Sequence, residues 1–388
     1  MTHTPRTPDP GGTRGSSSLP SDDDGGMTRR DLAKRGAQLA AVLGLAQYVP
    51  TSLAAAATGP GSNLFPDLHG QTITMVTYGG TSQKALEEAY AKPFSKRTGL
   101  KILQDAPVDY SKVKAQVQAK HVTWDAFDGD PNTSVAFCRD HLAEPLSPST
   151  LRGIDKKYYS GKCGLPINVY AAVLAYDAQK FGARPPFGWK DFFNTSKYPG
   201  KRGMWSVLAL NQLEVALLAD GVPPKKLYPL DIDRAIRKLD TIKKDIIFFD
   251  SLGESTEQMV ARSVVMSCQV NTRAYPAVLQ GAPFKPAWHQ AVLAWEVWQI
   301  PKGSPNKAAA EAFLRWMGTA VAQARTVKSL TFGSTATHPI TPKGLSRNVL
   351  DWLPTTPKNS KTAVAIQPAW WAAHLDEATE KFTNWATS

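Results

Sequence analysis

The sequence lacks the short motifs that mark several large enzyme classes. It contains no Gly-x-Ser-x-Gly, His-Glu-x-x-His or Cys-x-x-Cys, and its seven histidines are dispersed along the chain. It also has no Walker loop and no Gly-x-Gly-x-x-Gly fingerprint, so no motif predicts a bound nucleotide. No spacing singles out a glycosidase-like carboxylate pair from ordinary surface acids. A secreted hydrolase is therefore the weaker hypothesis, and we expect no cofactor and no metal.

The chain also lacks a concentrated basic tract, although its formal net charge is +12. Nucleic-acid binding would favour an arginine-rich or aromatic-interleaved basic run, and neither is present. The basic pairs are spread out instead, which indicates a solvated basic surface and no nucleic-acid partner: Lys156-Lys157, Lys201-Arg202, Lys225-Lys226 and Lys243-Lys244. With 388 residues, 42% of them hydrophobic and 20% charged, the sequence predicts one large or two medium globular units.

The leader, residues 1–57, has no apolar run long enough to span a membrane. Its first 26 residues are almost free of apolar side chains, so we expect them to be disordered, and Met27 is an alternative start. A charged start, a short apolar middle and a small-residue end follow at residues 28–34, 39–49 and 52–57. This order predicts a removable signal peptide, whose paired arginines, Arg29-Arg30, resemble a twin-arginine export signal.

Cysteine is scarce, with three in the whole chain. None precedes Cys138, so the signal lacks the cysteine that anchors a lipoprotein, and we expect an exported protein, periplasmic or extracellular and cell-wall associated. In an oxidising compartment Cys138 and Cys163 are plausible disulfide partners, although three cysteines allow three pairs. Cys268 lies in an apolar run, which favours a buried thiol.

The part of the chain that follows the leader alternates between strand and helix patterns. Residues 71–78 predict a strand that ends at Gly79-Gly80, residues 81–96 a helix and residues 100–103 a second strand. This order is a βαβ unit, whose crossover favours a parallel sheet. Further strands are predicted at 126–128, 169–176, 246–250 and 292–300, and further helices at 112–120, 134–141, 213–219, 231–244, 254–262 and 307–317. The fold class is therefore α/β.

The turn after the first strand is the first candidate for binding a ligand. It reads Tyr78, Gly79, Gly80, Thr81 and Ser82. Ligands in α/β sheets bind at the carboxyl ends of strands, where glycines expose backbone N–H groups and helix N-termini carry partial positive charge. A tight structural turn explains the same residues equally well.

Several motifs, taken in their order along the chain, resemble one known family. They are Tyr78-Gly79-Gly80, Lys92-Pro93-Phe94, Thr98-Gly99, Glu144-Pro145-Leu146, residues 174–177 and 213–221, Asn271 with Arg273 and Tyr275, Ile300-Pro301-Lys302-Gly303, Leu353-Pro354-Thr355, and Trp370-Trp371. The chain resembles the extracellular solute-binding proteins of the spermidine/putrescine type, over most of residues 70–388. Each motif is modest alone, and their order carries the assignment.

The resemblance implies a two-lobed type II periplasmic binding protein fold, each lobe a mixed, mostly parallel sheet flanked by helices, with a hinge between the lobes. Residues 58–172 with 297–338 would form lobe 1, and residues 173–296 with 339–388 would form lobe 2. It also implies a small-molecule solute held between the lobes, and the membrane permease and ATPase subunits of an ABC importer as partners. We expect a monomer.

The resemblance further implies which acids would hold an ammonium group. Polyamine-binding members use acids and flanking aromatic rings, and this sequence keeps Glu214 and places Glu296 on the strand before Ile300. A second acid is here Asn211, and two expected aromatic residues are Val270 and Ala294. Since half of the polyamine-binding set is missing, a smaller solute with one amine, such as an ω-amino acid, is the better hypothesis.

Other residues join the candidate site through the same resemblance. Arg273 would hold a carboxylate in a bidentate pair, unless it bonds its own lobe's backbone instead. Asp128 and Asp130 fall where the family lines its cleft, and capping of the next turn is their competing role. The remaining candidates are Asn271 and the aromatic residues Trp205 and Tyr275. For Trp295 core packing is the preferred role.

A ferric-iron or anion-binding protein on the same fold is the alternative. The adjacent Tyr158-Tyr159 superficially suits ferric iron, because phenolates bind hard cations. Ferric-binding relatives carry their pair in the other lobe, however, and Cys163 follows closely. Packing near the expected disulfide is therefore the favoured interpretation of this pair.

Overall fold

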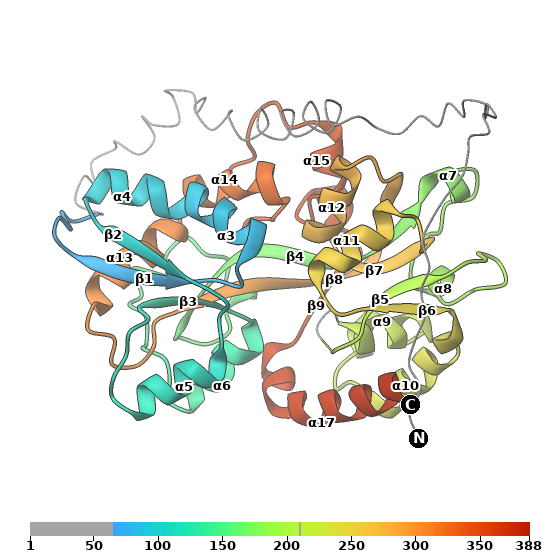
Figure 1. Ribbon diagram of the computed structural model, residues 1–388, viewed down its shortest axis with the longest axis horizontal. Helices are drawn as coiled ribbons and strands as arrows, with labels where there is room; N and C mark the ends of the chain where they lie inside the picture. Colours follow the sequence, from blue (N-terminus) through green and yellow to red (C-terminus); the bar gives the residue numbers. More distant parts are fainter. Residues whose placement is uncertain (1–64, 209–210) are drawn as a thin grey trace, which may run out of the picture. The chain divides into compact units, whose positions relative to one another are not determined.

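The computed structural model describes residues 65–208 and 211–388. The predicted leader, signal peptide and cleavage region at 1–57 lie outside these residues. The described strands form one sheet of nine strands, in the order β2-β1-β3-β8-β4-β7-β5-β6, with β9 paired to β8. Figure 1 shows helices on both faces of this sheet, as expected for an α/β protein.

The first part of the chain builds one end of the sheet. Its elements are β1 (Thr72–Val76), α3 (Gly80–Leu86), the π-helical turn η2 (Glu87–Ala91), α4 (Lys92–Thr98), β2 (Lys101–Asp105), α5 (Tyr110–Gln118), β3 (Ala126–Gly129), α6 (Pro131–Arg139) and the 3₁₀ turn η3 (Lys156–Tyr158). Strand β1 is parallel to both β2 and β3, so the predicted βαβ unit is confirmed. The helix predicted at 81–96 is continuous across α3, η2 and α4.

The middle of the chain builds the other end of the sheet. Its elements are β4 (Gly164–Asp177), α7 (Ala178–Phe181), α8 (Trp189–Phe192), β5 (Arg202–Trp205), α9 (Gln212–Ala219), η4 (Pro224–Lys226), α10 (Ile232–Asp240), η5 (Lys243–Asp245), β6 (Ile246–Phe249), α11 (Leu252–Val260), β7 (Met266–Val270) and α12 (Asn271–Leu279). Strand β5 is parallel to β6 and β7, so this end also has a parallel set.

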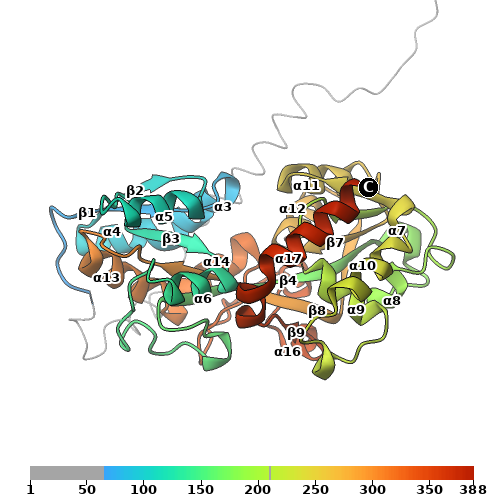
Figure 2. The same ribbon diagram turned by 90° about the horizontal axis from the view of Figure 1, so that it is seen from below.

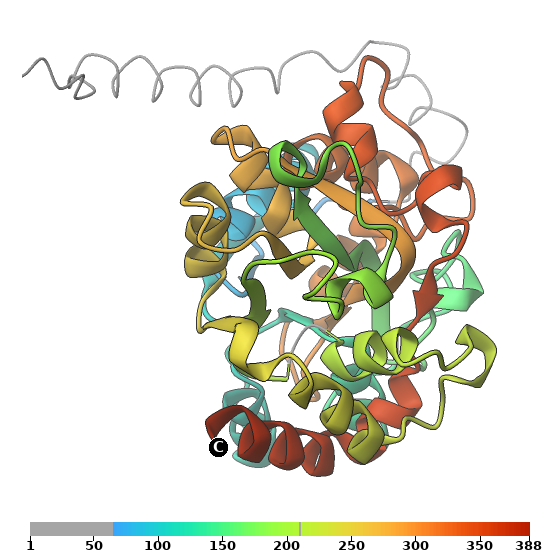
Figure 3. The same ribbon diagram turned by 90° about the vertical axis from the view of Figure 1, so that its right-hand side faces the viewer.

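The last part of the chain returns to both ends. Its elements are β8 (Phe284–Gln299), α13 (Lys307–Met317), α14 (Ala320–Leu330), α15 (Arg347–Asp351), α16 (Pro357–Ser360), β9 (Val364–Ala365) and α17 (Pro368–Thr387). Helix α17, red in Figures 2 and 3, packs against α10 and also contacts α6 from the first part of the chain. Strand β8 begins eight residues before the predicted 292–300 segment.

Two long antiparallel strands, β4 and β8, join the two ends of the sheet. Leu165 and Ile167 of β4 belong to the hydrophobic core under α4 and α13, whereas Val169 and later β4 residues belong to the core under α9, α10 and α17 or, on alternate positions from Ala171 to Ala175, to the core under α12 and α15. The same change occurs on β8 between Trp298 and Val297. Both strands therefore pass from one core to the other, while the predicted lobe boundaries stay a prediction.

The disulfide lies at the start of one of these strands. Cys138 of α6 is bonded to Cys163, with 5.4 Å between the Cα atoms, and Gly164 then begins β4. This is the pair that the sequence favoured. Cys268 is buried on β7, where burial raises the pKa of its thiol to about 12.

Candidate ligand-binding site

The candidate site forms where parallel strands of both ends of the sheet terminate. Tyr78 follows β1 and Asp130 follows β3, while Trp205, Phe249 and Val270 are the last residues of β5, β6 and β7. The carboxyl ends of parallel strands are where α/β proteins place ligands, because the loops there are free to carry binding groups. The sheet thus supplies the site from two sets of strand ends.

Three acids gather on one face of the sheet. Asp128 of β3 lies opposite Trp298 of β8, and Glu296 precedes Trp298 by two residues, so both acids point to the same face. Asp130 follows Asp128 by two residues and continues that row. Asp128 is 1% exposed and Glu296 is half-buried, so water screens this negative charge poorly.

Asp130 is the best-satisfied of the three acids. Its Oδ2 accepts from the hydroxyls of Tyr78 and Tyr110, each at 3.2 Å, and its Oδ1 accepts from the Tyr170 hydroxyl at 3.5 Å. Asp130 precedes α6, but its side chain makes no capping bond, so the capping role is not the one seen here. Burial raises the pKa of Asp130 even though these three hydroxyls lower it.

Asp128 and Glu296 keep acceptor capacity unused. Oδ1 of Asp128 is buried and has no hydrogen-bond partner. Glu296 accepts one bond, from Nδ2 of Asn168 at 2.7 Å. Burial raises the pKa of Glu296 to about 7, although Asn168 and the charge of Arg273 lower it. Burial and then Glu296 raise the pKa of Asp128 well above its usual range.

Arg273 brings positive charge to the same site. Its Nη2 donates to Oγ of Ser82 at 2.7 Å. Ser82 lies on α3 at the other end of the sheet, so Arg273 is not confined to a bond with the backbone of its own end. Burial lowers the pKa of Arg273, and the charge of Glu296 offsets this effect. Gly79 and Gly80 precede Ser82 with φ of 87° and 66°, a backbone region that favours glycine. The side chain of Thr81 lies outside the part of the chain that the structure describes.

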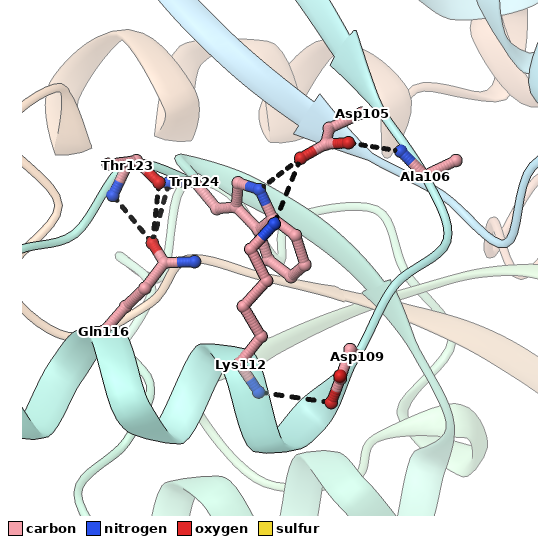
Figure 4. A network of polar contacts seen from close by, with 7 residues as sticks. All are labelled: Asp105, Ala106, Asp109, Lys112, Gln116, Thr123 and Trp124. Atoms are coloured by element: carbon pink, nitrogen blue, oxygen red, sulfur yellow. Dashed lines mark hydrogen bonds and ion pairs between the residues drawn. The ribbon is translucent and has the colours of Figure 1, made fainter.

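The start of α5, which carries Tyr110, is held by the network of polar contacts drawn in Figure 4. Tyr110 is the first residue of α5, and Asp109 caps that helix by accepting from the N–H groups of Ser111 and Lys112. Asp105, which ends β2, accepts from the Trp124 indole at 2.7 Å and lies 3.5 Å from the Lys112 ammonium. Helix α5 is therefore tied to β2, which fixes the position of Tyr110.

Aromatic and apolar residues form a second wall. Phe249 and Val270 pack with the partly buried Tyr170 and Trp205, and the Trp205 and Phe249 rings meet edge to face at 5.2 Å. The Trp205 indole N–H is buried and has no hydrogen-bond partner. Such an unused donor is uncommon, since buried polar groups are normally paired.

Glu214 has different neighbours from those expected. It is 0% exposed on α9, where its Oε1 accepts from the Tyr228 hydroxyl at 2.6 Å and the Trp371 indole at 2.7 Å. Burial raises its pKa. Tyr228 and Trp371 belong to or pack against the core under α9, α10 and α17. Its Oε2 is buried and has no hydrogen-bond partner, so Glu214 combines core contacts at one oxygen with an unused acceptor at the other, and its role in holding the solute stays a prediction.

Two other expected ligand residues, Asn271 and Tyr275, also make contacts within the protein. Asn271 is buried, with its oxygen accepting from Ala171 N–H and its amide donating to the carbonyls of Thr331 and Trp352. Tyr275 is 5% exposed in the core beside Trp352. Asn271 and Tyr275 therefore have contacts within the protein, and their role in holding the solute stays a prediction.

Asn211 lies at the cap position of α9, with φ of 60° and no side-chain capping bond. It is half-buried and precedes Glu214 by three residues. Its side chain bonds the Glu214 carboxylate and lowers the pKa that burial raises there, so the structure brings these two predicted residues together.

The ferric-iron hypothesis finds no support at Tyr158 and Tyr159. Tyr158 packs edge to face on Trp295 at 5.3 Å, and the Tyr159 hydroxyl donates to the Leu151 carbonyl at 3.0 Å. Trp295 is 1% exposed, which agrees with its expected core role. Within the described ranges, no three His, Cys, Asp or Glu side chains are grouped so as to hold a metal ion.

Comparisons with known proteins give the family of the chain. Residues 89–343 match the family model of bacterial extracellular solute-binding proteins. The chain belongs to this family. A γ-aminobutyric acid-binding protein of Pseudomonas aeruginosa is 33% identical over 325 residues, covering 81% of this chain and 91% of that protein. These matches identify a solute-binding protein, and neither of them is to a protein of the spermidine/putrescine type.

Solved structures show the same fold. The solved structure of a receptor for γ-aminobutyric acid (GABA) is 31% identical in sequence to this chain and has a TM-score of 0.75. The match covers 81% of this chain and 98% of the receptor chain. The protein AgtB of Agrobacterium tumefaciens, solved with agropinic acid, is 28% identical, with a TM-score of 0.71, over 82% of this chain and 99% of that one. The predicted two-lobed α/β binding fold is confirmed. No helix among residues 65–208 and 211–388 is both long and apolar enough to cross a membrane.

Sequence reasoning missed Tyr110, Asn168 and Tyr170. Tyr110 follows Asp109, an ordinary cap, and Tyr170 lies inside an apolar strand pattern, so neither is conspicuous. Asn168 interrupts that strand with a polar residue, and this was the one signal that the sequence offered. An asparagine inside a buried strand needs a partner, and the partner here is Glu296.

Proposed function

We propose that this solute-binding protein serves an ABC importer and captures a small solute with one ammonium and one carboxylate group, an ω-amino acid such as γ-aminobutyrate. The observation that carries the proposal is the unused acceptor at Asp128, buried beside Glu296, with Arg273 close by. An ammonium group supplies the missing donors and neutralises the like charges.

The carboxylate end of the solute would face donors. Arg273 offers the charge, and the unpaired Trp205 indole offers a second donor on the aromatic wall. Tyr170 lies between the acids and this wall, since its hydroxyl bonds Asp130 and its ring packs against Phe249 and Val270. A short methylene chain fits such an aromatic surface by apolar contact and cation–π attraction.

The similar proteins support this solute class. The Pseudomonas aeruginosa relative is a γ-aminobutyric acid-binding protein, and a receptor for the same compound shares the fold at 31% identity. We extend the proposal to permease and ATPase subunits as partners, to a monomeric state, and to export by the twin-arginine route. The anion-only alternative would leave the three acids without a role.

A binding panel tests the proposal. Isothermal titration and thermal unfolding are measured with γ-aminobutyrate, 5-aminovalerate, butyrate, butylamine and putrescine. We expect the two amino acids to bind best, and at 100 times the dissociation constant to add about 2.7 kcal/mol to the unfolding free energy. Stabilisation by putrescine alone would restore the polyamine hypothesis, and stabilisation by butyrate alone would favour an anion carrier.

A further inference from the structure

Asn168 stands at an irregular point of β4. The β4–β8 register shifts between Ile167 and Val169, and Asn168 has φ of 52° and 0% exposure. A bulge of this kind re-aims the side chain that it carries. The side chain here is turned toward Glu296 of the neighbouring strand.

The orientation of the Asn168 amide is determined by two further hydroxyls. Oδ1 of Asn168 accepts from the Tyr90 hydroxyl at 2.7 Å and from the Thr326 hydroxyl at 3.2 Å. Tyr90 and Thr326 are 0% and 1% exposed, so water does not compete for them. The Tyr90 hydroxyl engages the amide oxygen, and the single proton of the Thr326 hydroxyl is shared between that oxygen and the Gln323 carbonyl at 2.8 Å. The amide therefore presents its NH₂ group to Glu296 and would lose the Tyr90 bond on flipping.

The two acids consequently differ in what faces them. Glu296 has an N–H donor, and Arg273 acts on it from α12. Oδ1 of Asp128 has no donor, and its charged neighbours are Glu296 and Asp130. The remaining titratable groups around the pair are the tyrosines Tyr78, Tyr90, Tyr110 and Tyr170, which are neutral at ordinary pH.

We infer that Asn168 is a positioning residue that holds Glu296 ionised, so that Asp128 carries the proton in the empty site and releases it when an ammonium group arrives. The step balances: the ligand keeps its own proton, the Asp128 carboxyl O–H bond breaks, and that proton goes to solvent. The inference rests on the proposed function for the ligand, but its first part concerns the empty protein alone. A donor stabilises the ionised form of the carboxylate that it contacts.

The empty protein is tested by NMR. Carboxyl carbons of Asp128 and Glu296 are followed against pH in the wild type and in Asn168→Gly, which removes the amide without strain at this φ. We expect Asp128 to keep its proton to higher pH in the wild type, and the Glu296 titration to move upward by about one pH unit in the variant. Thr326→Val, which leaves the bond to Glu296 in place, should move it much less. Glu296 ionising last in the wild type, or no movement in Asn168→Gly, would overturn the inference.

The bound protein is tested by titration calorimetry with γ-aminobutyrate at pH 8, where Glu296 is ionised, in two buffers of different ionisation enthalpy. We expect about one proton released for each ligand bound by the wild type, and about none by Asp128→Asn. Binding without proton release would contradict the second part of the inference. Failure of γ-aminobutyrate to bind the wild type would refute the proposed function, while the NMR result still decides the role of Asn168.

Discussion

Two glutamates, Glu214 and Glu296, were expected to hold the same ammonium group, and the structure gives them opposite surroundings. Glu214 is 0% exposed and accepts from a tyrosine and a tryptophan of its own core. Glu296 is half-buried, accepts from one amide and lies near two other acids. Tyr228 and Trp371 hold Oε1 of Glu214 within the core and leave its Oε2 unpaired, whereas Glu296 lies beside two other acids with which it can share an ammonium group.

The largest expected effect separates the two glutamates by stability. Glu214→Ala leaves the Tyr228 hydroxyl and the Trp371 indole unpaired in the core, so we expect the unfolding free energy to fall by about 3 kcal/mol. The affinity for γ-aminobutyrate should stay within about threefold of the wild type, because Tyr228 and Trp371 hold the Glu214 carboxylate within the core. Urea unfolding and calorimetry measure both quantities. Glu257→Ala, an exposed acid on α11, serves as the control, with a change of under about 0.5 kcal/mol.

The opposite pattern is expected for the second glutamate. Glu296→Gln removes the charge that pairs with the ammonium, so the affinity for γ-aminobutyrate should fall about 100-fold, which corresponds to about 2.7 kcal/mol. The unfolding free energy should be unchanged or higher, because burial disfavours the charged form of Glu296 and the glutamine amide is neutral. Affinity retained within threefold would mean that Glu296 does not contact the solute.

The pH dependence of the ligand-free protein sharpens the comparison. Since the folded pKa of Glu296 is about 7, above its unfolded value, the folded state binds more protons than the unfolded state between about pH 5 and 7. The Glu296 contribution is therefore present at low pH and lost as pH rises through 7. We expect wild-type stability to fall by about 2 kcal/mol relative to Glu296→Gln over this window. Parallel curves for the two proteins in urea unfolding would contradict this assignment.

The smallest effect concerns the network behind Tyr110. Oε1 of Gln116 accepts from Thr123 N–H at 2.7 Å and from Trp124 N–H at 3.2 Å, which connects α5 to the segment before β3 (Figure 4). Gln116→Ala should lower the unfolding free energy by about 1 kcal/mol and weaken γ-aminobutyrate binding less than about threefold. A loss as large as that of Glu296→Gln would show that Tyr110 contributes far more than its hydrogen bonds suggest.

Most elements at the end of the sheet built by the first part of the chain could be predicted from local sequence. The alternation at 71–78, the glycines after it and the helix pattern at 81–96 predicted β1 and the helices that follow it, because these signals depend on near neighbours. The start of β8 at Phe284 was missed, since residues 285–290 are exposed or only partly buried and their polar and bulky side chains give no clean alternation. The position of Glu296 near Asp128 depends on the β3–β8 pairing, which joins residues far apart in sequence.

Three predicted site residues have surroundings that their place in the sequence did not indicate, for one reason. Family position suggested Glu214, Asn271 and Tyr275, but position along a helix or strand does not determine which way a side chain turns after packing. Helix α9 is buried on all sides, as its residues 212–219 show, so any polar residue on it must find its partner within the core. Asn168, Tyr110 and Tyr170 were missed for the converse reason, since only tertiary contacts bring them to the acids.

The placement of the binding groups affects how such a protein changes its preference over evolutionary time. Glu296 and Tyr170 belong to the interiors of β8 and β4, where an inserted or deleted residue would turn every following side chain to the other face. Trp205 instead ends β5 and opens onto the connection before α9, where insertions are tolerated. Evolving proteins of this fold would thus change how they recognise the solute's amine by single substitutions. They could change how they recognise its carboxylate end by altering the length of the loop after β5.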